Sequence, residues 1–258
     1  MLSYFSNPQR FDVLARYAIP VCGVIAGLLL LAGVYMSFFA SPPDYQQGET
    51  VRIMYVHVPA AYMALAIYLA MAVASLVFFV WRHSLADAAA EVMAPIGAIF
   101  TALALLTGSL WGKPMWGTWW EWDARMTSVL VLLLIYLGYI ALRGAIEDRN
   151  QAARMASILA MAGVINLVIV KYSVEWWSSL HQGASIEFNT ERMDPVTGQV
   201  ERVLVESAIS GSMLWPLALM ALGYTFLAAW LVFYRLRSRT LIQRVRAIQT
   251  RREREGRA

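Results

Sequence analysis

Six apolar stretches divide this chain, and each is long enough to cross a lipid bilayer, which takes about 20 helical residues. In hydrocarbon, a backbone satisfies its own hydrogen bonds only as a helix or a closed barrel. Only 15% of the residues are charged, whereas soluble domains carry about a quarter. The sequence therefore predicts an all-α integral membrane protein, a single domain over residues 1–258 folded as a six-transmembrane-helix bundle. The predicted spans are approximately residues 18–40, 56–81, 92–111, 127–143, 155–175 and 212–234.

The placement of basic residues predicts the orientation, because cytoplasmic loops of membrane proteins carry an excess of Lys and Arg. With the N-terminus inside, 15 of the 21 basic residues fall in cytoplasmic segments. Nine of them are arginines of the tail 235–258, which we expect to be a helix that extends the last span and touches lipid headgroups, not nucleic acid. Both termini are then cytoplasmic. The segments predicted to face outward are 41–55, 112–126 and 176–211, and the last contains a predicted β-hairpin over 186–206, around Asp194-Pro195.

One outer segment is unusually rich in tryptophan. Residues 111–123 read WGKPMWGTWWEWD and hold five of the ten tryptophans. Two glycines and a proline argue against a simple helix interior, so we expect a loop over 112–126 that offers a flat, apolar surface to a large planar ligand. Tryptophans at a membrane edge are usually anchors, but anchoring does not readily explain five in thirteen positions. The residues of this surface are Trp111, Trp116, Gly117, Trp119, Trp120, Trp122 and Asp123; Asp123 is also a good N-cap for the next helix.

Two of the three histidines share this outer side. His57 lies at the start of the second span and His181 follows the fifth, whereas His83 lies on the inner side. Haem iron accepts two axial imidazoles, one on each face, so this pair predicts a haem site. Arg52 and Arg125 are the nearest cations in sequence and are possible partners for the haem propionates. The simpler alternative is that these histidines and arginines are hydrogen-bonded interfacial residues.

Several other functions fit the sequence less well. The chain has no P-loop and no HExxH motif, so we expect neither ATP hydrolysis nor zinc-dependent catalysis, and no enzyme activity. A haem-carrying membrane anchor of a respiratory redox complex would need histidines spaced along the spans. A small-solute transporter would need ionisable or broken-helix positions near the midplane. Asn166 is polar within the fifth span, but a buried Asn more often bonds neighbouring helices.

Residues 116–123, WGTWWEWD, resemble the tryptophan-rich WGxxWxWD motif (the WWD domain) of haem-handling proteins of cytochrome c maturation. With six spans and one histidine in each flanking outer region, the whole chain resembles the haem exporter protein C (CcmC) family. The resemblance implies a protein of the bacterial inner membrane that holds haem b transiently and without a covalent bond. It implies that His57 and His181 are the axial ligands and that the tryptophan segment presents haem to the chaperone CcmE. It also implies association with CcmA, CcmB and CcmD, with CcmA as the ATPase, and basic residues at Arg52 and Arg125 that influence haem or chaperone binding.

Overall fold

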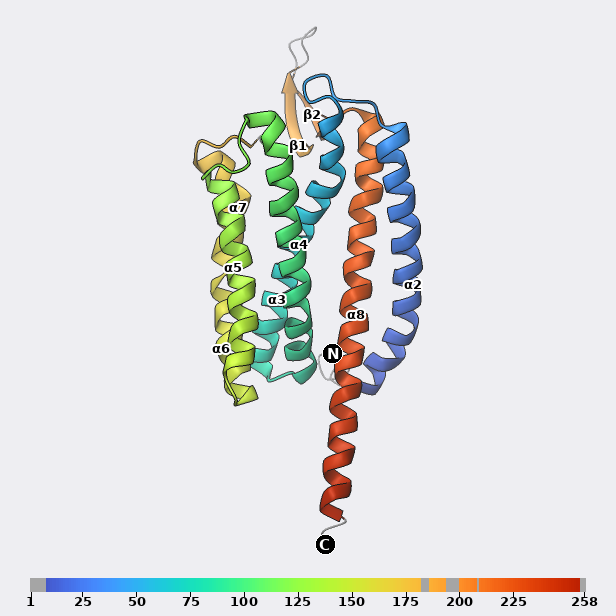
Figure 1. The fold of residues 1–258 in the computed structure, drawn as a ribbon, viewed down its shortest axis with the longest axis vertical. Helices are drawn as coiled ribbons and strands as arrows, with labels where there is room; N and C mark the ends of the chain where they lie inside the picture. Colours follow the sequence, from blue (N-terminus) through green and yellow to red (C-terminus); the bar gives the residue numbers. More distant parts are fainter. Residues whose placement is uncertain (1–7, 182–185, 194–199, 208, 256–258) are drawn as a thin grey trace.

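The computed structural model describes residues 8–181, 186–193, 200–207 and 209–255. The described residues contain six helices that are long and apolar enough to cross a membrane, which confirms the predicted all-α, six-span architecture. Figure 1 shows them as an upright bundle with both chain ends near the same end of the molecule. The α-helices are α2 (Pro8–Tyr35), α3 (Met54–Trp81), α4 (Ser84–Trp116), α5 (Ala124–Ala145), α6 (Arg149–Ala162), α7 (Val164–Trp176) and α8 (Gly211–Glu255). The shorter α6 and α7 together form the fifth span. A π-helical turn, η1 (Met36–Ala40), ends the first span, and a 3-10 turn, η2 (Glu49–Ile53), begins the second.

The end of the bundle away from the termini carries the longer connections, from η1 to η2, from α4 to α5 and from α7 to α8 (Figure 1). Strands β1 (Ile186–Met193) and β2 (Val200–Ser207) pair antiparallel there, with Ile186 opposite Ser207, which confirms the predicted hairpin. The expected turn at Asp194-Pro195 lies outside the described residues. At the other end, the basic tail continues α8 as a helix as far as Glu255, as expected.

The tryptophan segment differs from its prediction, because its first part is helical. Helix α4 continues to Trp116, so the connection to α5 is only 117–123 and not 112–126. Pro114 removes one backbone donor from the last turn but does not end the helix. The helix ends instead at Gly117, whose amide donates to the carbonyl of Lys113 at 3.0 Å and whose φ of 78° suits glycine.

The fifth span also differs, because a turn at Gly163 divides it into α6 and α7. The hydroxyl of Tyr68 on α3 donates to the carbonyl of Ala160 at 3.0 Å, which holds α6 against α3. A Cβ at position 163 would lie 1.9 Å from that hydroxyl, so only glycine leaves room for it. Beyond the turn, Asn166 donates to the carbonyl of Ser128 at 2.9 Å, so it bonds neighbouring helices as the sequence suggested.

Buried tyrosines join the middle helices of the bundle. Tyr136 on α5 donates to the carbonyl of Ala64 on α3 at 2.9 Å, and its ring contacts Tyr68 edge to face with centroids 5.0 Å apart. A Cβ at Gly97 would lie 2.2 Å from this phenol, so the missing side chain on α4 lets the ring pack between helices. Near the termini, Arg143 on α5 pairs with Asp87 at 2.6 Å and with Glu91, both on α4. Hydrogen bonds and ion pairs therefore join the helices from the middle of the bundle to the end that carries the termini.

Candidate functional site

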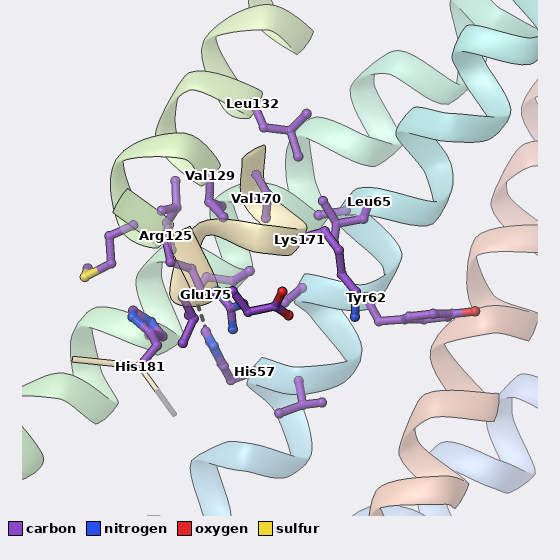
Figure 2. A pocket seen from close by; sticks show the side chains of 18 residues that line it. His57, Tyr62, Leu65, Arg125, Val129, Leu132, Val170, Lys171, Glu175 and His181 are labelled. Carbon is purple, nitrogen blue, oxygen red and sulfur yellow. Dashed lines mark hydrogen bonds between the residues drawn. The ribbon is translucent and has the colours of Figure 1, made fainter. Parts of the chain in front are cut away.

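A cavity of about 360 Å³ lies between α3, α4, α5 and α7. Its walls are mostly apolar, and Figure 2 shows His57 and His181 at one end of it and Leu132 at the other. The sequence placed the two histidines on one side of the membrane, and the structure brings both to one cavity. The lining residues are His57, Val58, Ala61, Tyr62, Ala64, Leu65, Ala104, Leu105, Gly108, Arg125, Met126, Val129, Leu132, Val170, Lys171, Val174, Glu175 and His181.

His57 is held by helix α4. Its Nδ1 lies 3.0 Å from the carbonyl oxygen of Ala104 and 3.1 Å from the hydroxyl of Thr107. A carbonyl only accepts, so Nδ1 carries the hydrogen in the neutral ring and Nε2 keeps its lone pair. A Cβ at Gly108 would lie 2.9 Å from Cε1 of the imidazole, so glycine allows this close approach to α4. His57 is therefore fixed with the lone pair of Nε2 available to coordinate a metal ion.

His181 is held by the buried carboxylate of Asp123. One oxygen, Oδ1, accepts from the amide of Met126 at 2.7 Å and caps α5, which confirms the predicted capping role. The other, Oδ2, accepts from Nδ1 of His181 at 2.7 Å and from the hydroxyl of Ser179 at 2.5 Å. Burial opposes ionisation of Asp123, but these hydrogen bonds outweigh it and hold its pKa below the usual 3.8. An ionised carboxylate requires the hydrogen on Nδ1, so His181 also keeps the lone pair of Nε2 available to coordinate a metal ion.

The tryptophan segment supplies one ring to each histidine. Trp111 contacts His57 edge to face with ring centroids 5.7 Å apart, and Trp116 contacts His181 in the same way at 5.0 Å. Trp120 contacts Trp122 at 5.5 Å. Trp119 and Trp122 are 54% and 72% exposed, so the segment has an inner pair against the histidines and an outer pair that faces away from the protein.

The two predicted arginines have different surroundings. Arg125 lines the cavity, where its Nε lies 3.3 Å from the hydroxyl of Ser173. Arg52 is not among the lining residues. Its guanidinium pairs with Glu49 at 2.5 Å and donates to the carbonyls of Ser37 and Ser41, so it joins η1 to η2.

Sequence reasoning missed several residues of this site. Lys171 and Glu175 line the cavity from α7, and a signal for them was present, because ionisable residues within a membrane span usually serve a function. The partners of the histidines, Ala104, Thr107 and Ser179, carry no comparable signal in the sequence. Two imidazoles with free Nε2 atoms, apolar walls and nearby cations can together hold a flat, carboxylate-bearing ligand that contains a metal with two open axial positions.

Comparison with known proteins identifies the family. The model of the family described as CcmC, heme exporter protein C, matches residues 1–251. The chain belongs to this family. A heme exporter protein C from Bradyrhizobium diazoefficiens is 48% identical over 244 residues, which cover 95% of this chain and 87% of the relative. The heme exporter protein C of Escherichia coli K12 is 44% identical over 95% of this chain and 93% of its own length. A ccmC-like mitochondrial protein of cytochrome c biosynthesis from Marchantia polymorpha is 43% identical over 88% of this chain and 89% of the relative.

The hydrogen bonds of the two imidazoles give a first test. With ¹⁵N-labelled histidine, NMR of the detergent-solubilised protein is expected to show a hydrogen on Nδ1 of both His57 and His181. Asp123→Ala is expected to release His181 into a mixture of tautomers and leave His57 unchanged. Asp148→Ala is the matched control, because Asp148 caps α6 in the same way at the other end of the bundle. Each variant loses about 1 kcal/mol of capping energy. An unchanged His181 spectrum in Asp123→Ala would contradict the assigned role of the carboxylate.

Proposed function

We propose that this protein binds haem b with its iron between Nε2 of His57 and Nε2 of His181, and delivers the haem to the chaperone CcmE during cytochrome c biogenesis. The observation that carries this proposal is that both imidazoles line one cavity and each has its Nδ1 occupied. Membership of the heme exporter protein C family supports it and favours haem handling over a redox anchor or a small-solute transporter. The protein acts by binding and release, not as an enzyme.

The cavity matches the two parts of a haem. Its aliphatic lining, including Val129, Leu132 and Val170, suits the apolar face of a porphyrin. Arg125 offers a guanidinium to a propionate, in the forked geometry that suits a carboxylate. We assign no direct haem contact to Arg52, because its guanidinium is already bonded to Glu49 and to two carbonyls. Its role is to keep η2, and with it the start of α3 and His57, in place.

The exposed tryptophans give the haem a route to a partner. Trp111 and Trp116 are held against the histidines, whereas Trp119 and Trp122 project from the same short segment. Aromatic side chains on an exposed surface are typical of binding hot spots. Trp119 and Trp122 therefore form the contact surface for CcmE, next to one edge of the bound haem.

The membrane orientation follows from the basic tail. The hairpin, the start of α3 and the end of α4 lie at the end of the bundle opposite the termini (Figure 1), and His57 and the tryptophan segment lie at those helix ends. The arginine-rich end of α8 favours the cytoplasmic side. The site then faces outward from the bacterial inner membrane, where cytochromes c are assembled. CcmA, CcmB and CcmD are the partners that this assignment implies, with ATP hydrolysis supplied by CcmA.

Removal of either imidazole tests the haem site. Purified wild-type protein is expected to show the visible spectrum of a low-spin, bis-imidazole haem. His57→Gly and His181→Gly are each expected to lose haem or to become high-spin, because one axial position is left empty. Added imidazole should restore the low-spin spectrum, and His83→Gly, at the other end of the bundle, should match the wild type. A wild-type protein that carries no haem would refute the proposal.

The exposed tryptophans test delivery separately from binding. Trp122→Ala is expected to lower the yield of haem-loaded CcmE at least about tenfold, as loss of an aromatic hot spot does, while the protein keeps its own haem. Trp215→Ala is the matched control, since Trp215 is 70% exposed near the same end of the bundle. The measurement is the covalent haem on CcmE co-expressed with each variant. Equal yields from both variants would remove the assigned docking role from Trp122.

A further inference from the structure

Helices α3 and α7 each contribute exposed as well as buried residues to the cavity that holds the histidines. On α4 and α5, the lining residues Ala104, Met126 and Leu132 are at most 6% exposed. On α3, by contrast, Val58 is 39% exposed and Tyr62 is 60% exposed, although both line the same cavity. On α7, the lining residues Lys171 and Glu175 are also exposed. The cavity therefore opens sideways, between α3 and α7.

The exposed residues of α3 indicate that lipid surrounds this opening. Val58 and Tyr62 continue an apolar stripe with helical spacing that runs along the length of the span. A stripe of this kind on a membrane helix faces lipid. The stripe consists of Val58, Tyr62, Leu69, Val73 and Leu76. The opening is thus continuous with the lipid-facing surface of α3.

The depth of the opening follows from α7. Lys171 precedes Trp176, at the end of the helix, by five residues, which is about 8 Å along an α-helix. Lys171 and Glu175 are one turn apart, and Ile165 and Val168 on the same helix are exposed and apolar. A lysine at this depth reaches toward the headgroups with its ammonium while its methylene groups stay in hydrocarbon. Figure 2 shows Tyr62 and Lys171 on the side of the pocket away from His181.

The turn at Gly163, between α6 and α7, explains why the cavity opens only in the half of the bundle that contains α7. Below the turn, Tyr68 bonds α6 to α3 through the carbonyl of Ala160. Above it, α7 begins a new helix, bonded to α5 through Asn166 and through the contact of Ser173 with Arg125. The upper half of the fifth span is therefore held by α5, which leaves the space between α7 and α3 for the cavity.

We propose that the ligand enters the cavity sideways from the outer leaflet of the bilayer, between α3 and α7, and that Lys171 at the rim attracts its carboxylates. This inference rests on the proposed haem function and adds the route of entry. The ligand is a flat amphiphile whose apolar ring dissolves among acyl chains while its carboxylates stay near the headgroups. The ammonium of Lys171 lies at the same depth in the membrane as these carboxylates and attracts them. Glu175, one turn nearer the surface, repels them and so limits how long they stay paired with Lys171. From the rim, the ring slides between Val58 and Val174 toward the two imidazoles.

A bulky residue at the rim tests the route. Wild-type protein, Val58→Trp and the matched control Leu69→Trp are reconstituted in phospholipid vesicles, haemin is added, and the Soret band is followed by stopped flow. The release rate is measured with excess apomyoglobin. Val58→Trp is expected to slow both binding and release about tenfold, because one obstructed path serves both directions. Leu69→Trp, on the same stripe but outside the cavity, should behave as the wild type.

The outcomes separate the route from the function. If wild-type protein binds haemin but Val58→Trp binds it as fast as Leu69→Trp, the ligand enters from water and the lateral route is wrong, while the proposed function stands. If Val58→Trp changes only the release rate, the substitution acts on the bound state, which also contradicts the route. If wild-type protein gives no haem spectrum, the proposed function itself fails.

Substitutions of Lys171 test the role of the charge at the rim. Lys171→Gln is expected to slow binding about tenfold, equivalent to about 1.4 kcal/mol, and Lys171→Arg should restore most of the rate. Arg149→Gln removes an exposed cation at the start of α6, outside the cavity, and should leave the rate unchanged. Equal binding rates in Lys171→Gln and Arg149→Gln would show that Lys171 does not attract the ligand.

Discussion

The carboxylate of Asp123 is the interaction on which the candidate site depends. With one oxygen it begins α5, and with the other it holds Ser179 and His181, which follow α7. It thereby joins the tryptophan segment and the adjoining start of the fourth span to the outer end of the fifth span, 56 to 58 positions later in the sequence. Because both oxygens are engaged, Asp123 stays ionised, and His181 is left with one orientation and one tautomer. His57 reaches the same state through a backbone carbonyl of α4.

The bundle combines a closed half with an open half. Near the termini the Arg143 ion pairs fix helix against helix, and about halfway along the spans the hydroxyls of Tyr68 and Tyr136 do the same. Toward the other end, the walls separate around the cavity. A haem-delivery protein needs both features, because the ligands of the iron must be positioned in advance, while the porphyrin must still enter and leave. A shallow, partly exposed site allows release to a partner, whereas a fully enclosed one would retain its haem.

The architecture was predictable because it follows from the bilayer. Apolar length gives the six spans, and the two histidines fall at one end because an even number of spans, the second to the fifth, lies between them. What could not be predicted depends on contacts made across the fold. Helix α4 continues through Pro114 because Gly117 ends it later, and the break at Gly163 depends on Tyr68, 95 positions earlier. Arg52 and Arg125 look equivalent in sequence, but Glu49 and two carbonyls engage only Arg52.

We propose that His57 and His181 bind one iron through their Nε2 atoms. The most direct test is pulsed electron paramagnetic resonance of the ferric haem-loaded protein with ¹⁵N-labelled histidine. Two equivalent sets of axial imidazole couplings and a low-spin signal are predicted, with one set lost in His57→Gly and the other in His181→Gly. Coupling to a single imidazole, or to none, in the wild-type protein would contradict the account.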